Sequence, residues 1–388
     1  MKFKVTQKNL NDCLKNVAPF ADKGHQLDII KNILLKTNKN LLEVSATNLD
    51  TSIVERVQGS CTEEGSITVP TSLFRDYVQN LPPEEKIELQ LDDKKLTVTC
   101  KNTKAVVNGL SPENYPNFPV NKKLKPFLEI EAGHLRDDLA RVVFAANKDI
   151  SRPILTGVFL HVFENEFYLA ATDGYRLAEK KVTKALNKPP AKAAEMQVLI
   201  PASAVMSLER VLSAQPSKKI SLYKEEDEKN VLFIVGDGEI EITALPLEGT
   251  YPDYRKLLPE KFSTEITVDR NDLVNAVKRA GLFSQEGPSS VILNWEAKKD
   301  KLNIKSSASQ VGGNDEDVEA EVKTTDKGDA TIVLNSRYLQ DVLGVMGSQS
   351  VRLGLNSKLD PCLLTGCEGA KGEQLDDGYR HAIMPLKP

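Results

Sequence analysis

The stretch Ile200–Leu212, IPASAVMSLERVL, joins a strand end to the start of a helix. A proline and a small hydroxyl residue follow an apolar pair, and apolar residues then recur at helical spacing, which is typical of a strand that leads into a capped helix. Val69–Leu81 (VPTSLFRDYVQNL) and Leu334–Met346 (LNSRYLQDVLGVM) have the same form. The three copies superpose without gaps at Pro70, Pro201 and Asn335. This regular recurrence predicts three copies of one module.

A second repeated pattern lies near the start of each module. Apolar residues occur there at positions i, i+4 and i+7, which predicts one buried stripe on an amphipathic helix. The three stripes are Leu10, Leu14 and Val17; Leu135, Leu139 and Val142; and Leu273, Val277 and Ala280. We therefore expect two helices per module, at 7–17, 71–81, 133–148, 202–214, 270–281 and 335–347.

Strand-like runs fill the rest of each module, separated by turn residues such as Gly236-Asp237-Gly238. The clearest runs are Ile87–Leu91, Leu96–Cys100, Ile220–Tyr223, Val231–Val235, Ile240–Leu245 and Thr331–Leu334. Strands and a few helices within every module indicate an α+β class. A chain of 388 residues is also too long for one core. Proline- and lysine-bearing segments at Val120–Pro126 and Leu257–Phe262 predict domains at 1–123, 124–257 and 258–388.

The composition indicates a cytoplasmic protein. The N-terminus, MKFKVTQKNL, lacks the apolar centre of a signal peptide, and no apolar run approaches the length of a membrane span. Five cysteines, an odd number in a large chain, fit a reducing compartment better than a disulfide framework.

The net charge of −4 argues against a general nucleic-acid binder, but the charge is unevenly distributed. The expected helices carry more basic than acidic residues, and the remainder of the chain is acidic. Several basic residues lie opposite the apolar stripe of their own helix at about 100° per residue. These are Lys8, Lys15, Arg141, Lys148, Lys278 and Arg279. The ordinary explanation is a solvated helix face, whereas repetition in all three first helices favours an electrostatic surface for nucleic acid.

Catalytic and metal-binding motifs are missing from the sequence. His25, His134, His161 and His381 have no metal-ligand spacing with another histidine or with cysteine. The sequence holds neither a phosphate-binding loop nor a nucleophile elbow. Asp173 beside Arg176 is read more simply as a turn residue and its neighbour. We therefore expect no catalysis, no metal and no cofactor.

The stretches Arg152–Leu160 (RPILTGVFL) and Leu169–Val182 (LAATDGYRLAEKKV) resemble the central domain of the bacterial DNA polymerase III beta subunits, the beta sliding clamps. Further similarities follow in order along the whole chain: MKFKV at the N-terminus, Asn32–Leu35, Gly249–Pro259, Leu334–Leu343 and Ile383–Leu386. The resemblance implies three like domains per subunit and a head-to-tail dimeric ring. Helices would line the hole, and duplex DNA would thread through it without sequence-specific contacts.

The resemblance also implies a groove between the second and third domains that binds a short linear peptide of partner proteins. The matching positions are Leu155, Thr172, Gly174, Tyr175, Arg176, Leu177, Pro252, Lys256, Leu257, Asn335, Tyr338, Ile383, Met384, Pro385 and Leu386. Apolar members would accept hydrophobic anchors, and polar members would fix the peptide backbone. Tyr175 stands where histidine is common in the family, and Lys256 where arginine is common, so the peptide preference is expected to be shifted. The ordinary alternative is that these are domain-junction core residues.

Two other surfaces follow from the helix charges and the resemblance together. The DNA-facing residues are expected to be Lys8, Lys15, Lys23, His25, Arg75, Arg141, Lys148, Arg210, Lys278 and Arg279. The subunit interface is expected to pack Leu282 and Phe283 against Ala105 and Val107 of a second copy. The acidic run from Asp315 to Glu321 would face Lys101 and Lys104 there, unless it is a flexible solvated loop.

The sequence thus favours a non-catalytic DNA sliding clamp that tethers the polymerase for processive replication. Its expected partners are double-stranded DNA, a second copy of the chain, the DNA polymerase III alpha subunit, the clamp loader and repair proteins. Two other classes stay open: a repeat-built protein-interaction module without DNA binding, and a hydrolase that uses Asp173 and His161. The expected location is the bacterial cytoplasm, at the nucleoid during replication.

Overall fold

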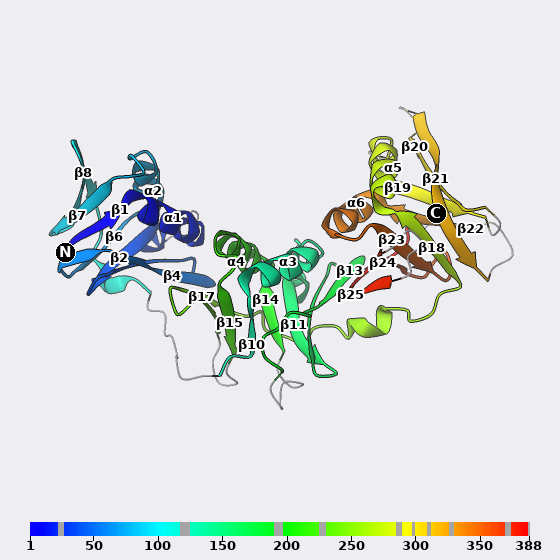
Figure 1. The fold of residues 1–388 in the computed structure, drawn as a ribbon, viewed down its shortest axis with the longest axis horizontal. Helices are drawn as coiled ribbons and strands as arrows, with labels where there is room; N and C mark the ends of the chain where they lie inside the picture. Colours follow the sequence, from blue (N-terminus) through cyan, green and yellow to red (C-terminus); the bar gives the residue numbers. More distant parts are fainter. Residues whose placement is uncertain are drawn as a thin grey trace. The chain divides into compact units, whose positions relative to one another are not determined.

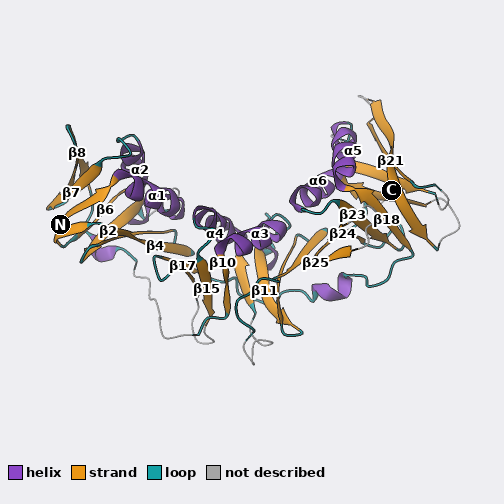
Figure 2. Cartoon of the chain, in the orientation of Figure 1, coloured by secondary structure: helices purple, strands orange, loops and turns teal. Residues whose placement is uncertain are grey.

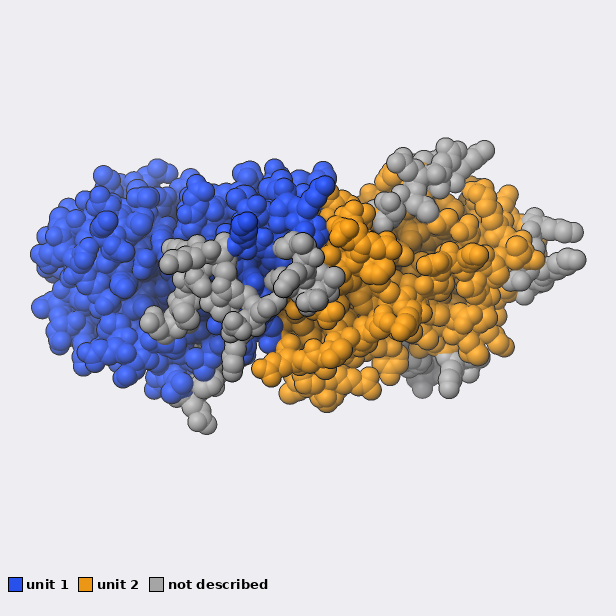
Figure 3. All heavy atoms as spheres, turned by 90° about the horizontal axis from the view of Figure 1, so that it is seen from below, with its two compact units in different colours: residues 1–136, 184–190, 203–246 blue, residues 137–183, 191–202, 247–388 orange. Residues whose placement is uncertain are grey.

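The computed structural model describes residues 1–21, 27–116, 125–189, 197–224, 230–284, 289–296, 299–308, 312–325, 330–368 and 374–386 (Figure 1). The chain forms two compact units (Figure 3). Unit 1 contains residues 1–136, 184–190 and 203–246, and unit 2 contains residues 137–183, 191–202 and 247–388. Both units are built of antiparallel strands with short helices (Figure 2). No helix in the described part of the chain is long and apolar enough to span a membrane.

One order of elements recurs three times along the described chain: a strand, a helix, several strands, a second helix and three strands. The first copy runs from β1 to β9, the second from β10 to β17 and the third from β18 to β25. The first copy has one additional short strand, β5, before its second helix. The predicted triplication of an α+β module is therefore present in the structure.

Unit 1 holds a five-stranded sheet, β5-β1-β7-β8-β9, and an eight-stranded sheet, β10-β15-β16-β17-β4-β3-β2-β6. Its helices α1 and α2 pack on each other, and α1 also contacts β3 and β4. The elements are β1 (Lys2–Thr6), α1 (Gln7–Val17), β2 (Asn32–Asn38), β3 (Leu41–Thr47), β4 (Thr51–Gln58), β5 (Ser60–Glu63), β6 (Ser66–Pro70), α2 (Thr71–Gln79), β7 (Lys86–Asp92), β8 (Lys95–Cys100), β9 (Thr103–Asn108), β10 (Leu128–Glu131), α4 (Ala202–Ala214), β15 (Lys219–Lys224), β16 (Val231–Val235) and β17 (Ile240–Ala244).

Unit 2 holds one twelve-stranded sheet, β14-β11-β12-β13-β25-β24-β23-β18-β21-β20-β19-β22. Its helices α5 and α6 pack on each other, and α5 covers β20 and β21. The elements are α3 (Ala132–Val143, entering this unit at Asp137), β11 (Gly157–Phe163), β12 (Glu166–Thr172), β13 (Arg176–Lys181), β14 (Val198–Pro201), the short 3-10 helix η6 (Tyr254–Leu257), β18 (Thr264–Asp269), α5 (Arg270–Leu282), β19 (Ser290–Trp295), β20 (Lys301–Ala308), β21 (Gly312–Thr324), β22 (Ala330–Asn335), α6 (Ser336–Val345), β23 (Ser350–Leu355), β24 (Cys362–Glu368) and β25 (Gln374–Ile383).

The six expected helices are confirmed, and so are the six expected strands. All three predicted apolar stripes are buried, since every member is at most 3% exposed. The expected turn at Gly236-Asp237-Gly238 joins β16 to β17, and both glycines have positive φ, at +66° and +93°. Glycine adopts this conformation without the steric cost that other residues carry.

The expected helix at 133–148 is too long, because α3 ends at Val143. The backbone N–H groups of Ala145 and Ala146 bond three residues back in a tighter turn. The carbonyl oxygen of Phe144 accepts a 2.8 Å hydrogen bond from the guanidinium of Arg176 on β13. A carbonyl that would otherwise lack a partner at the helix end is satisfied in this way. Lys148 therefore lies in the following loop and not on the helix.

Candidate functional site

The turn between β12 and β13 presents several of the predicted pocket residues. One carboxylate oxygen of Asp173 accepts hydrogen bonds from the backbone N–H groups of Tyr175 and Arg176, both at 2.9 Å. The hydroxyl of Thr172 donates to the Arg176 carbonyl at 2.6 Å and accepts from the Gly174 N–H at 3.0 Å. These four bonds fix the turn locally, as aspartate and threonine side chains do in such turns. Tyr175 is left 62% exposed at its tip.

Arg176 is buried and joins three parts of unit 2. Its guanidinium lies 3.1 Å from the Asp173 carboxylate and 2.5 Å from the Asp341 carboxylate on α6. It also lies over the ring of Tyr338, 4.4 Å from the ring centroid. With the bond to the Phe144 carbonyl described above, all three guanidinium nitrogens donate to an oxygen. The Tyr338 ring lies against the flat face, an arrangement that suits the planar geometry of arginine. Arg176 thus holds α6 and the end of α3 against β13.

The C-terminal segment is anchored beside the same turn. Ile383 is fully buried at the end of β25. The N–H of Met384 donates to the Tyr175 carbonyl, and the N–H of Leu386 donates to the Val333 carbonyl on β22, both at 2.8 Å. Terminal residues are usually mobile unless bonded in this manner. The Met384 side chain is 41% exposed, so an ordered backbone presents an adaptable apolar side chain.

Asn335 begins α6. Its side-chain oxygen accepts hydrogen bonds from the N–H groups of Arg337 at 2.9 Å and Tyr338 at 3.3 Å. This is the N-cap arrangement that satisfies donors in the first helical turn. Tyr338, in the first turn of this helix, carries its ring against the Arg176 guanidinium.

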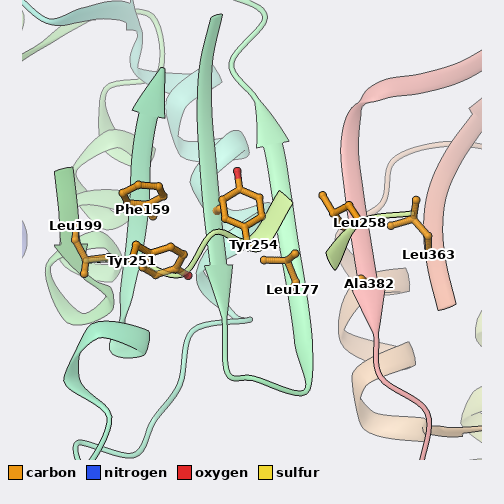
Figure 4. Packing of buried hydrophobic residues seen from close by; sticks show 9 residues of the cluster. Phe159, Leu177, Leu199, Tyr251, Tyr254, Leu258, Leu363 and Ala382 are labelled. Carbon is orange, nitrogen blue, oxygen red and sulfur yellow. The ribbon is translucent and has the colours of Figure 1, made fainter. Parts of the chain in front are cut away.

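An apolar cluster lies beneath these residues. Leu177 belongs to it, and the half-buried Leu155 packs against it. Figure 4 shows the side chains of Tyr251, Tyr254 and Leu258, which come from the segment between β17 and β18, beside cluster members carried by strands. The buried members are Phe159, Ala170, Leu177, Leu199, Tyr251, Tyr254, Leu258, Leu363 and Ala382. Part of the predicted pocket is therefore a domain-junction core, as the ordinary alternative proposed.

All fifteen predicted pocket positions lie within unit 2, and they fall into three groups by exposure. The buried ones are Arg176, Leu177 and Ile383. The half-buried ones are Leu155, Thr172, Asn335, Tyr338, Pro385 and Leu386. The exposed ones are Gly174, Tyr175, Pro252, Lys256, Leu257 and Met384. The exposed and half-buried groups supply the surface that a ligand can touch, and the buried group supports it. Asp341 and Phe144 belong to this support, and the sequence analysis did not identify them.

The predicted DNA-facing residues differ in exposure and in whether they form ion pairs within the described chain. Lys15 pairs with Asp12 at 3.0 Å, Arg75 with Asp76 at 2.7 Å and Arg279 with Glu316 at 2.6 Å. Exposed members without a recorded ion pair among the described residues are Lys8, Lys148, Arg210 and Lys278. Arg141 is half-buried, and Lys23 and His25 lie outside the described residues. Exposed ion pairs are weak, so the pairs of Lys15, Arg75 and Arg279 can exchange partners at little cost.

The predicted interface residues on β9 have a different exposure from the one expected. Val107 is only 4% exposed and faces its own core, whereas Val106 is 55% exposed. Leu73 and Leu110 are also exposed, at 59% and 44%. Leu282 at the end of α5 is 65% exposed. Ala105 and Phe283 are half-buried. The apolar surface available near β9 is therefore formed by Val106 and its neighbours.

The acidic run lies on strand β21 and is not a loop. Several of its carboxylates pair within the chain: Asp315 with Lys305 at 3.0 Å, Glu316 with Arg279, and Asp317 with Lys301 at 3.6 Å. These side chains are at least partly exposed, and pairs of this kind exchange partners at little cost. Lys101, expected to face the run across an interface, pairs with Glu85 at 2.7 Å.

Asp173 and His161, the residues of the hydrolase alternative, have separate structural partners. His161 is 7% exposed, and its Nε2 lies 2.7 Å from the Tyr254 hydroxyl. Burial lowers the pKa of His161 to about 4, so the ring is neutral near pH 7. Asp173 is engaged by the turn and by Arg176. In the described part of the chain, His, Cys, Asp and Glu form no group of three that could hold a metal ion.

The three modules each match a model of one protein family. Residues 1–119 match the N-terminal domain of the DNA polymerase III beta subunit, residues 129–253 its central domain and residues 255–386 its C-terminal domain. Three copies of one α+β module that match these three domain models define the class of DNA sliding clamps. The chain belongs to the DNA polymerase III beta subunit family, and it functions as a sliding clamp in DNA replication.

Similar proteins cover the whole chain. The beta sliding clamp of Synechococcus elongatus is 29% identical over 390 residues, which span 100% of this chain and 99% of that protein. The beta sliding clamp of Staphylococcus epidermidis is 26% identical over 387 residues, covering 97% and 96% of the two chains. The crystal structure of the DNA polymerase III beta subunit from Pseudomonas aeruginosa covers both chains fully, with a TM-score of 0.87 at 25% identity. The Bacillus subtilis sliding clamp shares the fold, with a TM-score of 0.89.

Proposed function

We propose that two copies of this chain close head to tail into a ring that encircles duplex DNA and slides along it. Retention would come from topology, because contacts to phosphates without base contacts are sequence-independent and individually weak. The exposed basic residues Lys8, Arg210 and Lys278 would face the DNA. The ring would have no catalytic activity and would work in the bacterial cytoplasm, at the nucleoid during replication.

The repeated way in which the modules join is the observation that carries this proposal. In unit 1, β4 of the first module pairs antiparallel with β17, the last strand of the second. In unit 2, β13 of the second module pairs in the same manner with β25, the last strand of the third. The strands at corresponding positions are β9 of the first module and β21 of the third, whose residues 312–319 pair only with β20 within the described chain, while 320–324 pair with β18. One further joint of the same kind therefore needs a second copy of the chain.

The remaining strands suit such a joint. β9 is the terminal strand of its sheet, so one of its edges is unpaired within the described chain. Lys104 and Val106 are exposed on β9, and β21 carries exposed acidic side chains. An edge with unpaired N–H and C=O groups is a template for a strand of another chain. Two such joints, related by a twofold axis, would close a dimer.

We propose further that the surface around Tyr175, Leu257 and Met384 binds a short linear peptide. The peptide would be carried by the polymerase III alpha subunit, the clamp loader and repair proteins. Exposed apolar side chains beside an ordered backbone support this assignment, because peptide sites combine hydrophobic pockets with fixed polar groups. Tyr175 and Lys256 would shift the sequence preference of the peptide.

Release from linearised DNA tests the ring. The protein is loaded on a nicked circular plasmid with clamp loader and ATP, and the complex is isolated by gel filtration. Cutting the plasmid once should release the protein, because a ring slides off a free end. The matched control is a plasmid that lacks the restriction site and should retain the protein. Retention on the cut DNA would contradict encirclement. If the protein shows no DNA binding at any salt concentration, the result would favour a protein-interaction module without DNA binding.

A further inference from the structure

The segment Leu247–Phe262, which connects the second module to the third, lies across the sheet of unit 2. Its Tyr251 stacks on Phe159 of β11, with ring centroids 4.6 Å apart. Tyr254 and Leu258 belong to the same buried cluster (Figure 4). The short helix η6 within this segment carries Lys256 and Leu257, which are exposed members of the proposed peptide surface. The position of η6 therefore decides where these two residues stand.

A buried carboxylate links η6 to the sheet. Glu179 on β13 is 1% exposed. Its Oε2 accepts a 2.7 Å hydrogen bond from the Tyr254 hydroxyl and lies 2.9 Å from the Arg255 guanidinium. Its Oε1 lies 2.7 Å from the guanidinium of Arg380 on β25, the residue directly opposite Glu179 in the strand pair. A buried carboxylate with this many donors keeps its charge satisfied in a site that excludes water.

The other groups around Glu179 hold the same segment. The Arg255 guanidinium lies over the rings of Phe163 and Tyr168, 3.8 and 4.1 Å from their centroids. His161 on β11 is neutral, and its Nε2 is within hydrogen-bond distance of the Tyr254 hydroxyl. The Tyr254 hydroxyl donates its own hydrogen to Glu179. The hydrogen between His161 and Tyr254 therefore belongs to the His161 Nε2–H, which donates to the hydroxyl oxygen. Arg255 is thus held by charge at Glu179 and by stacking on two rings.

We infer that Glu179 is a positioning residue for the peptide surface: it holds η6 so that Lys256 and Leu257 stand at the rim of that surface. This inference rests on the proposed peptide binding. Glu179 itself is too deeply buried to touch a ligand, so its effect passes through Tyr254 and Arg255.

The carboxylate charge is essential to this role. A glutamine in place of Glu179 would offer one acceptor oxygen where two now serve, and its amide N–H₂ would face a guanidinium. The positive charges of Arg255 and Arg380 would then lack their shared counter-charge, and Arg255 would be favoured in solvent. If η6 is docked for only a fraction of the time, the apparent peptide affinity falls to that fraction of its full value. Loss of one charge-assisted contact predicts a reduction of about tenfold.

The test uses the full-length protein with Glu179→Gln and, as a matched control, Glu265→Gln. Glu265 pairs with Arg352 at 3.1 Å between β18 and β23 of the same unit and has no part in the contacts of Glu179, Tyr254 and Arg255. Affinity is measured by fluorescence anisotropy with a labelled synthetic peptide that copies the clamp-binding segment of the polymerase III alpha subunit. Glu179→Gln should bind about tenfold more weakly, and Glu265→Gln should bind like the unaltered protein. Retention on nicked circular DNA should be the same for all three.

A spin label on η6 separates positioning from general destabilisation. Lys256→Cys in a Cys61→Ser background carries a nitroxide, because the other native cysteines are buried. The label should be more mobile in Glu179→Gln and unchanged in Glu265→Gln. If Glu179→Gln folds poorly, Arg255→Lys replaces it in the test. This variant keeps the charge but loses the planar stacking, and it should show both the weaker peptide binding and the more mobile label.

Unchanged peptide affinity in Glu179→Gln, or weakened affinity with an immobile label, would overturn the inference. Failure of the unaltered protein to bind the peptide would contradict the proposed function instead. In that case the label would still show whether Glu179 immobilises η6.

Discussion

Charged residues at the two strand joints show what individual side chains contribute to this molecule. At the β4–β17 joint, Arg56 lies 2.8 Å from Glu241 and 3.1 Å from Glu43. At the β13–β25 joint, Glu179 and Arg380 form the equivalent cross-strand pair. A buried ion pair is costly to break, because removal of one partner leaves the other charge buried without a counter-charge or water to stabilise it. Each joint therefore combines a backbone ladder with a charge pair that disfavours other registers.

Glu55, next to Arg56 on β4, should make the stability of unit 1 depend on pH. Burial raises the pKa of Glu55 to about 7, and it accepts a 3.0 Å hydrogen bond from Asn16. The folded state binds this proton more tightly than the unfolded state does. The free energy of unfolding should therefore fall as the pH rises from about 4.5 to 7, the reverse of an ordinary salt-bridged carboxylate.

Glu55→Gln removes this dependence while keeping the acceptor for Asn16. At pH 8 the variant should be more stable than the unaltered protein by on the order of 1–3 kcal/mol, and at pH 5 the difference should nearly vanish. Urea unfolding followed by circular dichroism at both pH values measures this, with the exposed Glu63→Gln as control. Equal differences at the two pH values would show that folding does not raise the pKa of Glu55.

At the scale of elements, sequence periodicity predicted the six described α-helices and the clearest strands, because local stripes and alternation are properties of the element itself. What it missed depends on distant residues. The end of α3 is set by Arg176, which contacts Phe144 across 32 residues of chain. The outward face of β9 was also missed, because Ala105, Val106 and Val107 are all apolar and show no alternation. The charge pairs at the joints were invisible for the same reason, since Glu179 and Arg380 lie 201 residues apart.

The C-terminal segment is the element whose removal should separate peptide binding from assembly. Deleting 384–388 removes the backbone bonds from Met384 to Tyr175 and from Leu386 to Val333, but leaves β25 complete to Ile383. We expect peptide binding to be lost and the dimer to be retained. Met384→Ala is the control, since it keeps both backbone bonds and should weaken binding only partly. Calorimetric titration and sedimentation measure the two properties, and peptide affinity that survives the deletion would refute the pocket assignment.

At the scale of the whole molecule, the triplication was readable from the sequence, but the joints were not. β4 and β17 pair within unit 1, and β13 and β25 pair within unit 2, although long stretches of chain separate the partners. No local pattern identifies which strands pair at such distances. The resemblance to sliding clamps supplied the predicted pocket positions, and the structure divided those positions into exposed, half-buried and buried residues. Domain limits at 123 and 257 stay predictions, the first of them in a segment outside the described residues.

The proposed dimer makes the last prediction. If β9 of one copy pairs with β21 of another, apolar side chains exposed near these strands are buried on assembly. Val106 and Leu282 are 55% and 65% exposed in the single chain. An aspartate at either position would bury an unpaired charge, and both Val106→Asp and Leu282→Asp should therefore yield monomers. Leu359→Asp is the matched control, because Leu359 is 59% exposed in the β23–β24 loop and belongs to neither strand. Analytical ultracentrifugation distinguishes the species. A dimer mass in Val106→Asp would place the interface elsewhere, and a monomer mass in the unaltered protein at micromolar concentration would contradict the ring itself.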